Sequence, residues 1–202
     1  MAQDSSVMAN VGGLHGSQHK ARDFRGLLLV CCFVHLMTEN SRPPALSVWI
    51  RLAPAYGSKL HQLVQDLGTA FDAPPFTPHV TLLGNAPKGS EEEATALVRQ
   101  LAEAVPPFEV KVLPEISFEG TWNQNVLMFV EETDGLLAAN AKAKEVLQGA
   151  APGVAASFAP PSRRPHLSLM YGDHSTEQRE AAIEWIKKHA PWAGEGFTFQ
   201  AE

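Results

Sequence analysis

The pattern of apolar and polar residues predicts interleaved strands and helices from Leu46 onward. Residues 46–52 (LSVWIRL) alternate apolar and other side chains, as a half-buried strand does. Apolar residues then recur at helical spacing from Leu60 to Phe71, behind a possible cap at Ser58. The same pattern predicts further strands over residues 80–84, 108–116, 126–131, 167–171 and 197–200. It predicts further helices over residues 90–105, 134–148 and 175–186.

The order of these elements repeats in the two halves of the chain. In each half a strand and a helix lead to a proline-rich stretch, which forces extended chain, and a histidine-bearing strand and another helix follow. Capping boxes, Ser90 with Glu93 and Ser175 with Gln178, open the helices after those strands. The pattern is typical of a diverged internal repeat. Since no Gly-rich nucleotide fingerprint occurs, we expect an α+β fold with two antiparallel sheets facing a central cleft.

Residues 1–44 show no sustained period and end at two consecutive prolines, so we expect a flexible N-terminal extension before a domain over residues 45–202. The extension contains one apolar run, residues 26–37, which at 12 residues is too short to span a bilayer. We therefore expect a cytoplasmic protein without stable membrane insertion. The alternative is an endomembrane location, on the Golgi or secretory route, if residues 26–37 act as a targeting segment.

Composition and charge narrow the class of ligand. A chain of 202 residues, 45% hydrophobic and 19% charged, suits one compact globular domain or two small lobes, and we expect a monomer. The net charge of −6 disfavours a long nucleic acid as partner, because that affinity depends on many basic side chains. A small phosphorylated ligand needs only one or two cations. The two cysteines, Cys31 and Cys32, are adjacent, so no disulfide framework or cysteine-based zinc site is expected.

Two matching segments carry the candidate chemistry: TPHVTLLG at residues 77–84 and RPHLSLMYG at residues 164–172. Each has a histidine after a proline and a hydroxyl residue two places later. Strand side chains alternate, so the histidine and the hydroxyl residue of each segment share one face. The alternate positions point to the core: Val80, Leu82, Leu167 and Leu169. Two such strands side by side would place both imidazoles and both hydroxyls, from His79, Thr81, His166 and Ser168, around one small pocket.

That set of groups suits the opening of a cyclic phosphodiester. A neutral imidazole can act as general base toward water, and a protonated one as general acid toward the leaving ribose oxygen. The Thr81 and Ser168 hydroxyls can donate hydrogen bonds to the non-bridging phosphate oxygens. Which histidine is base and which is acid stays open at this point. We expect no cofactor and no metal, because neither motif strand offers a carboxylate or cysteine to complete a ligand set.

The paired His-x-Thr/Ser segments resemble the signature of the two-histidine phosphoesterase superfamily, and the body of the chain resembles its cyclic phosphodiesterase branch of plants and fungi. The resemblance implies a bilobal α+β fold with a pseudo-twofold axis and helices outside. It implies a catalytic tetrad of His79, Thr81, His166 and Ser168, with Tyr171 at the pocket edge beside the phosphate.

The resemblance also implies the reaction. Members of this branch hydrolyse ADP-ribose 1″,2″-cyclic phosphate, a by-product of tRNA splicing, to ADP-ribose 1″-phosphate. Several also open nucleoside 2′,3′-cyclic phosphates to 2′-phosphates. Two alternatives stay open: an RNA-end-processing or 2′-5′ phosphodiesterase of the same superfamily, and a non-catalytic nucleotide-binding module. The acidic charge balance argues against the first, and the completeness of both motifs argues against the second.

For several other residues the sequence allows two interpretations. Arg163 and Arg164 are either pyrophosphate contacts or exposed loop residues. Trp122 is either a base-stacking residue or packing, and Trp49 either core or pocket floor. The remaining histidines of the predicted body, His61, His174 and His189, are interpreted as surface residues.

Overall fold

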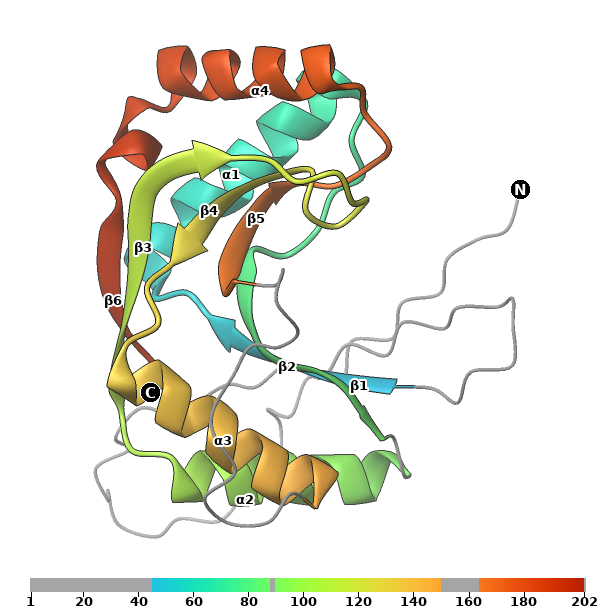
Figure 1. The fold of residues 1–202 in the computed structure, drawn as a ribbon, viewed down its shortest axis with the longest axis vertical. Coiled ribbons are helices and arrows are strands. Elements are labelled where there is room, and N and C mark those ends of the chain that lie inside the picture. Colours follow the sequence, from blue (N-terminus) through green and yellow to red (C-terminus); the bar gives the residue numbers. More distant parts are fainter. Residues whose placement is uncertain (1–44, 88–89, 150–163, 202) are drawn as a thin grey trace, which may run out of the picture.

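A computed structural model describes residues 45–87, 90–149 and 164–201 (Figure 1). The expected extension, with its apolar run and both cysteines, lies outside these residues. The six strands are β1 (Ala45–Arg51), β2 (His79–Pro87), β3 (Phe108–Ser117), β4 (Val126–Val130), β5 (His166–Met170) and β6 (Phe197–Ala201). The helices are α1 (Pro54–Phe71), α2 (Glu91–Ala104), α3 (Asp134–Gln148) and α4 (Thr176–His189), with a 3-10 turn, η1 (Pro191–Glu195), before β6.

The α+β class is confirmed, but the expectation of two separate sheets is wrong. The six strands form one antiparallel sheet in the order β1-β2-β5-β4-β3-β6. Strands β2 and β5, which carry the two motifs, pair with each other at Val80 and Leu167. This pairing joins β1 and β2 to the other four strands in one sheet. The sheet curls between two groups of helices (Figure 1).

Each group of helices takes one helix from each half of the chain. Helix α1 packs with α4, and α2 packs with α3 (Figure 1). The element order itself repeats, strand-helix-strand-helix-strand, from β1 to β3 and again from β4 to β6, with η1 added before the last strand. None of the helices in the described part of the chain is both long and apolar enough to cross a bilayer.

The core positions expected from strand alternation are confirmed. Val80, Leu167 and Leu169 are 0% exposed and Leu82 is 2% exposed. On α3, the buried Asn140 side chain donates a 2.7 Å hydrogen bond to the Leu82 carbonyl. The helix thereby fixes β2 beyond its pairing with β5, because a buried carbonyl needs a donor. Burial of one face of β2 and β5 leaves the opposite face for the motif side chains.

Local sequence signals set most element boundaries. Both capping boxes form, at Ser90 and at Ser175, and open α2 and α4 as expected. The expected cap at Ser58 is wrong, because α1 begins one turn earlier, at Pro54. Proline suits the first position of a helix, where its missing N–H needs no partner.

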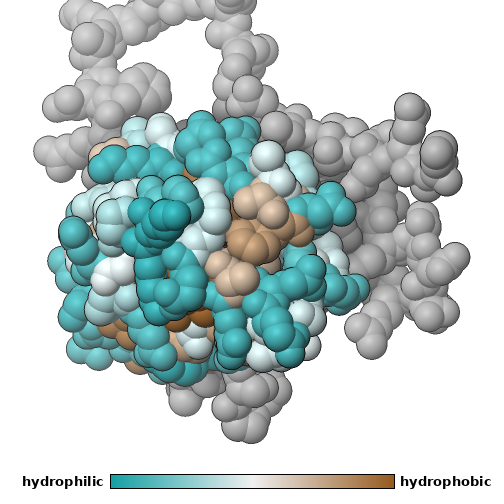
Figure 2. All heavy atoms as spheres, turned by 90° about the horizontal axis from the view of Figure 1, so that it is seen from above, coloured by the Kyte–Doolittle hydropathy of each residue, from teal (hydrophilic) through white to brown (hydrophobic). Residues whose placement is uncertain are grey.

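The face of the molecule seen from the α4 side is mostly hydrophilic, with a few small hydrophobic areas among the polar residues (Figure 2). Trp122 is the large hydrophobic side chain that the described residues leave exposed, at 47%. It lies between β3 and β4.

Candidate active site

The two motifs meet where β2 pairs with β5. Val80 pairs with Leu167, and these residues hold the same position in the two motifs. In an antiparallel ladder the flanking residues then lie opposite each other: His79 faces Ser168, and Thr81 faces His166. Since Val80 and Leu167 point into the core, these four side chains share the other face. The structure thus brings together the four residues that the motif spacing predicted.

Both imidazole rings are held in the same way, by the residue before the motif proline. The Nδ1 of His79 lies 2.7 Å from the Thr77 carbonyl oxygen, and the Nδ1 of His166 lies 3.0 Å from the Arg164 carbonyl oxygen. A carbonyl oxygen only accepts, so Nδ1 carries the proton in each ring, and Nε2 has the lone pair when the ring is neutral. The proline fixes this arrangement, because it holds the preceding residue in extended conformation.

His79 is the more buried of the two histidines, with 8% of its surface exposed. Its ring stacks on Trp49 of the neighbouring strand β1, with centroids 3.6 Å apart and planes 11° apart. Burial lowers the pKa of His79 to about 4, the Thr77 carbonyl opposes this, and the charge of His166 lowers the pKa further. His79 is therefore a neutral base at pH 7, close enough to His166 to respond to its charge. Trp49, left open from sequence, belongs to the site.

His166 is partly exposed and has a cation nearby. The β4–β5 register places it opposite Phe129. The Arg164 guanidinium lies over the Phe129 ring, 3.9 Å from its centroid. Arg164 thus brings positive charge to the approach of the second motif, while Arg163 lies outside the described residues.

The hydroxyl groups of the site differ in their surroundings. Thr81 is half-buried on β2. The Ser168 hydroxyl donates to the Asn123 carbonyl, 3.0 Å away in the β3–β4 loop, so it must turn from that carbonyl in order to donate to a ligand. Burial raises the pKa of the Tyr171 phenol, against an opposing hydrogen bond with Ser168. Tyr171 therefore stays a neutral donor beside Ser168.

Three aromatic rings extend from Ser168 toward solvent. Tyr171 stacks on Phe76, with centroids 3.9 Å apart and planes 16° apart. On the other side, the Trp122 ring lies 5.2 Å from Tyr171 at a tilt of 33°. The exposed Trp122 face provides a surface on which a planar ring can stack.

A buried polar network holds the loops that carry these rings. Asn125, 0% exposed, donates from Nδ2 to the Gly172 carbonyl and to Nδ1 of His174. The His174 Nε2 donates to the Phe71 carbonyl at 2.9 Å. Arg179 donates from Nε to the Asn125 Oδ1 at 3.0 Å. The interpretation of His174 as a surface residue is therefore wrong: its ring joins the end of α1 to the β5–α4 loop.

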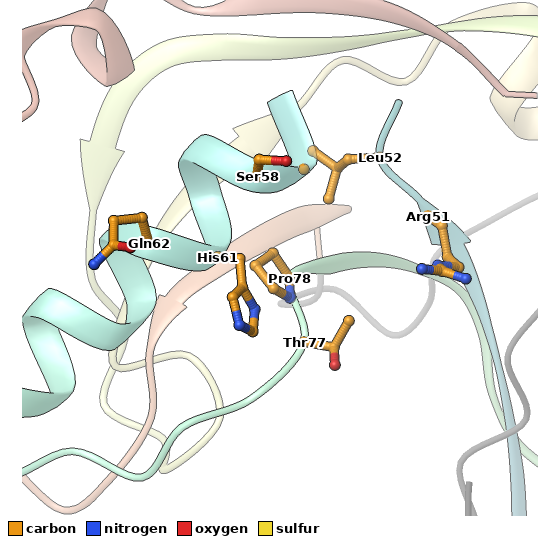
Figure 3. A pocket seen from close by; sticks show the side chains of 8 residues that line it. Arg51, Leu52, Ser58, His61, Gln62, Thr77 and Pro78 are labelled. Carbon is orange, nitrogen blue, oxygen red and sulfur yellow. The ribbon is translucent and has the colours of Figure 1, made fainter. Parts of the chain in front are cut away.

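A pocket of about 330 Å³ lies where β1, the start of α1 and the residues before β2 meet. Arg51 from β1 and His61 from α1 line it, with Thr77 and Pro78 between them (Figure 3). Sequence analysis did not identify Arg51. The sequence does contain an indication of its role: Arg51 lies two residues after Trp49 on a predicted strand, so the two side chains share a face. Within residues 45–87, 90–149 and 164–201, no three His, Cys, Asp or Glu side chains are grouped so as to hold a metal ion.

Comparison with known families supports the motif assignment. A family model described as the 2′-5′ RNA ligase superfamily matches residues 59–200. The match contains both histidine motifs, with most of the sheet and three of the four helices in full. A search of curated proteins found no match to the chain.

Proposed function

This chain belongs to the 2′-5′ RNA ligase superfamily of two-histidine phosphoesterases, and we propose that it is a metal-independent cyclic phosphodiesterase. The family supports a phosphoesterase role. The observation that carries the proposal is the meeting of the two motif strands at Val80 and Leu167. It gives a pair of histidines, each held through Nδ1, on one face of the sheet. The proposed arrangement is bilobal, with a pseudo-twofold axis that relates the two motifs.

In the proposed reaction, His79 is the general base, because its lowered pKa keeps it neutral at pH 7. Its Nε2 takes a proton from water, and the water oxygen attacks phosphorus. The bond from phosphorus to one ribose oxygen breaks, and His166 supplies the proton to that oxygen. His79 then holds the added proton and His166 lacks one, so proton exchange with solvent restores the starting state.

The hydroxyl groups stabilise the charge that develops on phosphate. Thr81 and Ser168 donate to the non-bridging oxygens, which become more negative as water attacks. Ser168 makes this bond by turning from the Asn123 carbonyl, and Tyr171 adds a neutral donor beside it. No step requires a metal ion or a cofactor.

The proposed substrate is ADP-ribose 1″,2″-cyclic phosphate, which yields ADP-ribose 1″-phosphate, and nucleoside 2′,3′-cyclic phosphates are opened to 2′-phosphates. The net charge of −6 supports a small ligand. The ring surface formed by Phe76, Tyr171 and Trp122 supports a ligand with a nucleobase. Both features support a small nucleotide-like substrate of this kind.

A second candidate is a 2′-5′ phosphodiesterase or RNA-end-processing enzyme with the same tetrad. The description of the matched family favours it. The acidic charge balance argues for a small substrate instead.

Turnover of three substrates in EDTA distinguishes these functions. The substrates are ADP-ribose 1″,2″-cyclic phosphate, adenosine 2′,3′-cyclic phosphate and a 2′-5′-linked diadenosine, with products identified by phosphorus NMR. We expect turnover of the two cyclic phosphates, with a 2′-phosphate as the product from the nucleotide. Cleavage of the dinucleotide alone would establish the second candidate. Binding of all three without turnover would establish a nucleotide-binding module.

A further inference from the structure

We propose that the pocket beside His79 is a subsite for a second phosphate group on the substrate, held by Arg51 and His61. The identity of the substrate as a cyclic phosphate rests on the proposed function. The subsite itself rests on the geometry around Arg51.

The strand register places Arg51 on the catalytic face. In the β1–β2 ladder, Trp49 pairs with Thr81 and Arg51 pairs with His79. Residues directly opposite each other in an antiparallel ladder present their side chains on the same face. Arg51 is therefore the next residue along the catalytic face from His79, on the edge strand of the sheet.

The pocket includes the residue that orients the His79 ring. Thr77 lines the pocket, and its carbonyl is the group that holds His79 Nδ1. Figure 3 shows Arg51 and His61 on opposite sides of Thr77, one from β1 and one from α1. A ligand in this pocket would therefore lie beside the residue that orients the catalytic ring.

The charge of the pocket is suited to an anion. The eight lining residues include Arg51, His61 and the polar side chains of Ser58, Gln62 and Thr77, but no Asp or Glu. Among the described residues, Arg51 forms no ion pair with a carboxylate. An exposed guanidinium that is not paired with a carboxylate can bind two phosphate oxygens at once.

The distance suits one small molecule with two phosphates. Neighbouring strands lie roughly 5 Å apart, and the arginine side chain extends this reach by several ångströms. A second phosphate on the same small molecule as the cyclic phosphate would therefore lie within reach of Arg51. The subsite would thus select substrates that carry a terminal phosphate or a diphosphate in addition to the cyclic one.

Matched substrates test the subsite. Adenosine 2′,3′-cyclic phosphate is compared with its 5′-phosphorylated counterpart, in the wild-type protein and in Arg51→Gln, Arg51→Lys and Arg99→Gln. We expect the wild type to prefer the 5′-phosphorylated substrate about 10- to 100-fold in kcat/KM, the usual strength of a charged hydrogen-bond pair. Arg51→Gln should bring this ratio close to one, and Arg51→Lys should retain part of it. Arg99→Gln is the control: it removes the same charge from an exposed position on α2 and should keep the wild-type ratio.

Equal loss on both substrates in Arg51→Gln would overturn the subsite and place Arg51 at the cyclic phosphate itself. A wild type that shows no preference between the two substrates would also overturn the subsite. Calorimetry with adenosine 2′-monophosphate and adenosine 2′,5′-bisphosphate separates this proposal from the proposed function, because binding needs no turnover. If no cyclic phosphate is hydrolysed but the bisphosphate binds at least tenfold more tightly, through Arg51, the proposed function fails and the subsite stands. Equal affinity for both ligands refutes the subsite.

Discussion

Replacement of Trp49 by alanine should change the acid–base behaviour of His79. The two rings stack at 3.6 Å, so the indole covers one face of the imidazole. His79 is 8% exposed, and burial is the main cause of its pKa of about 4, against an ordinary value of 6.5. Removal of the indole opens that face to water. Because water stabilises the charged imidazolium, the pKa of His79 should rise toward its ordinary value.

The change in rate follows from the fraction of neutral base. At about pH 5, a group with a pKa of about 4 is roughly nine-tenths neutral, but one with a pKa of 6.5 is only about 3% neutral. Trp49→Ala should therefore lose up to roughly 30-fold in kcat/KM near pH 5 through protonation alone. At about pH 8 the base is neutral in both proteins, so any loss there measures poorer positioning of the ring.

The assay is the pH profile of kcat/KM on a cyclic phosphate, together with an NMR titration of the His79 ring. Trp49→Phe is the matched control, because a smaller ring still covers the imidazole and should keep most of the lowered pKa. Thermal unfolding verifies that both variants fold. If the acidic limb and the titration midpoint of Trp49→Ala equal those of the wild type, the stacked indole does not keep His79 neutral and the argument is wrong.

Three further predictions concern the stability of the fold and the hydroxyl groups that donate to the phosphate. Gly172→Ala should destabilise the fold by about 1–3 kcal/mol in urea unfolding, because the φ of Gly172 is 128° and a Cβ would lie 2.6 Å from the His174 ring. Gly194→Ala is the control and should destabilise the fold far less, because a Cβ there meets open space. Because the folded-state pKa of His79 is lowered, the unfolded chain binds more protons between about pH 4 and 6.5, so the unfolding free energy should fall by up to about 3 kcal/mol as pH drops through that window. His79→Phe should remove that slope, and an unchanged slope would contradict the lowered pKa. Thr81→Ala and Ser168→Ala should each lower kcat less than loss of a catalytic histidine does, since each removes one donor among several; a larger loss from either would reverse the assigned roles.

Each histidine–hydroxyl pair could be predicted from sequence because strand geometry alone places its two side chains. A histidine and a hydroxyl two places apart share a face, whatever their strand pairs with. The capping boxes at Ser90 and Ser175 could be predicted for a similar reason, because each involves groups within one turn. The pairing of β2 with β5 could not, because it joins segments far apart in the chain, and this is why two sheets were expected instead of one.

The roles that the sequence left open or did not indicate depend on such long-range register. Arg51 lies opposite His79, and Trp49 covers the His79 ring, only because β1 pairs with β2. The role of His174 depends on Asn125, which precedes a different strand. A histidine before a helix resembles a surface residue until the tertiary partners of its two nitrogens are known.

Turnover by the single and double histidine variants in EDTA tests the central claim most directly. The claim is that His79 and His166 act together to open a cyclic phosphate. We expect His79→Ala and His166→Ala each to lower kcat by about two to four orders of magnitude, the usual effect of general acid–base catalysis. The double variant should be little worse than the poorer single one, because the two groups act in one step. Loss of wild-type turnover in EDTA, or single variants with nearly full turnover, would contradict the account.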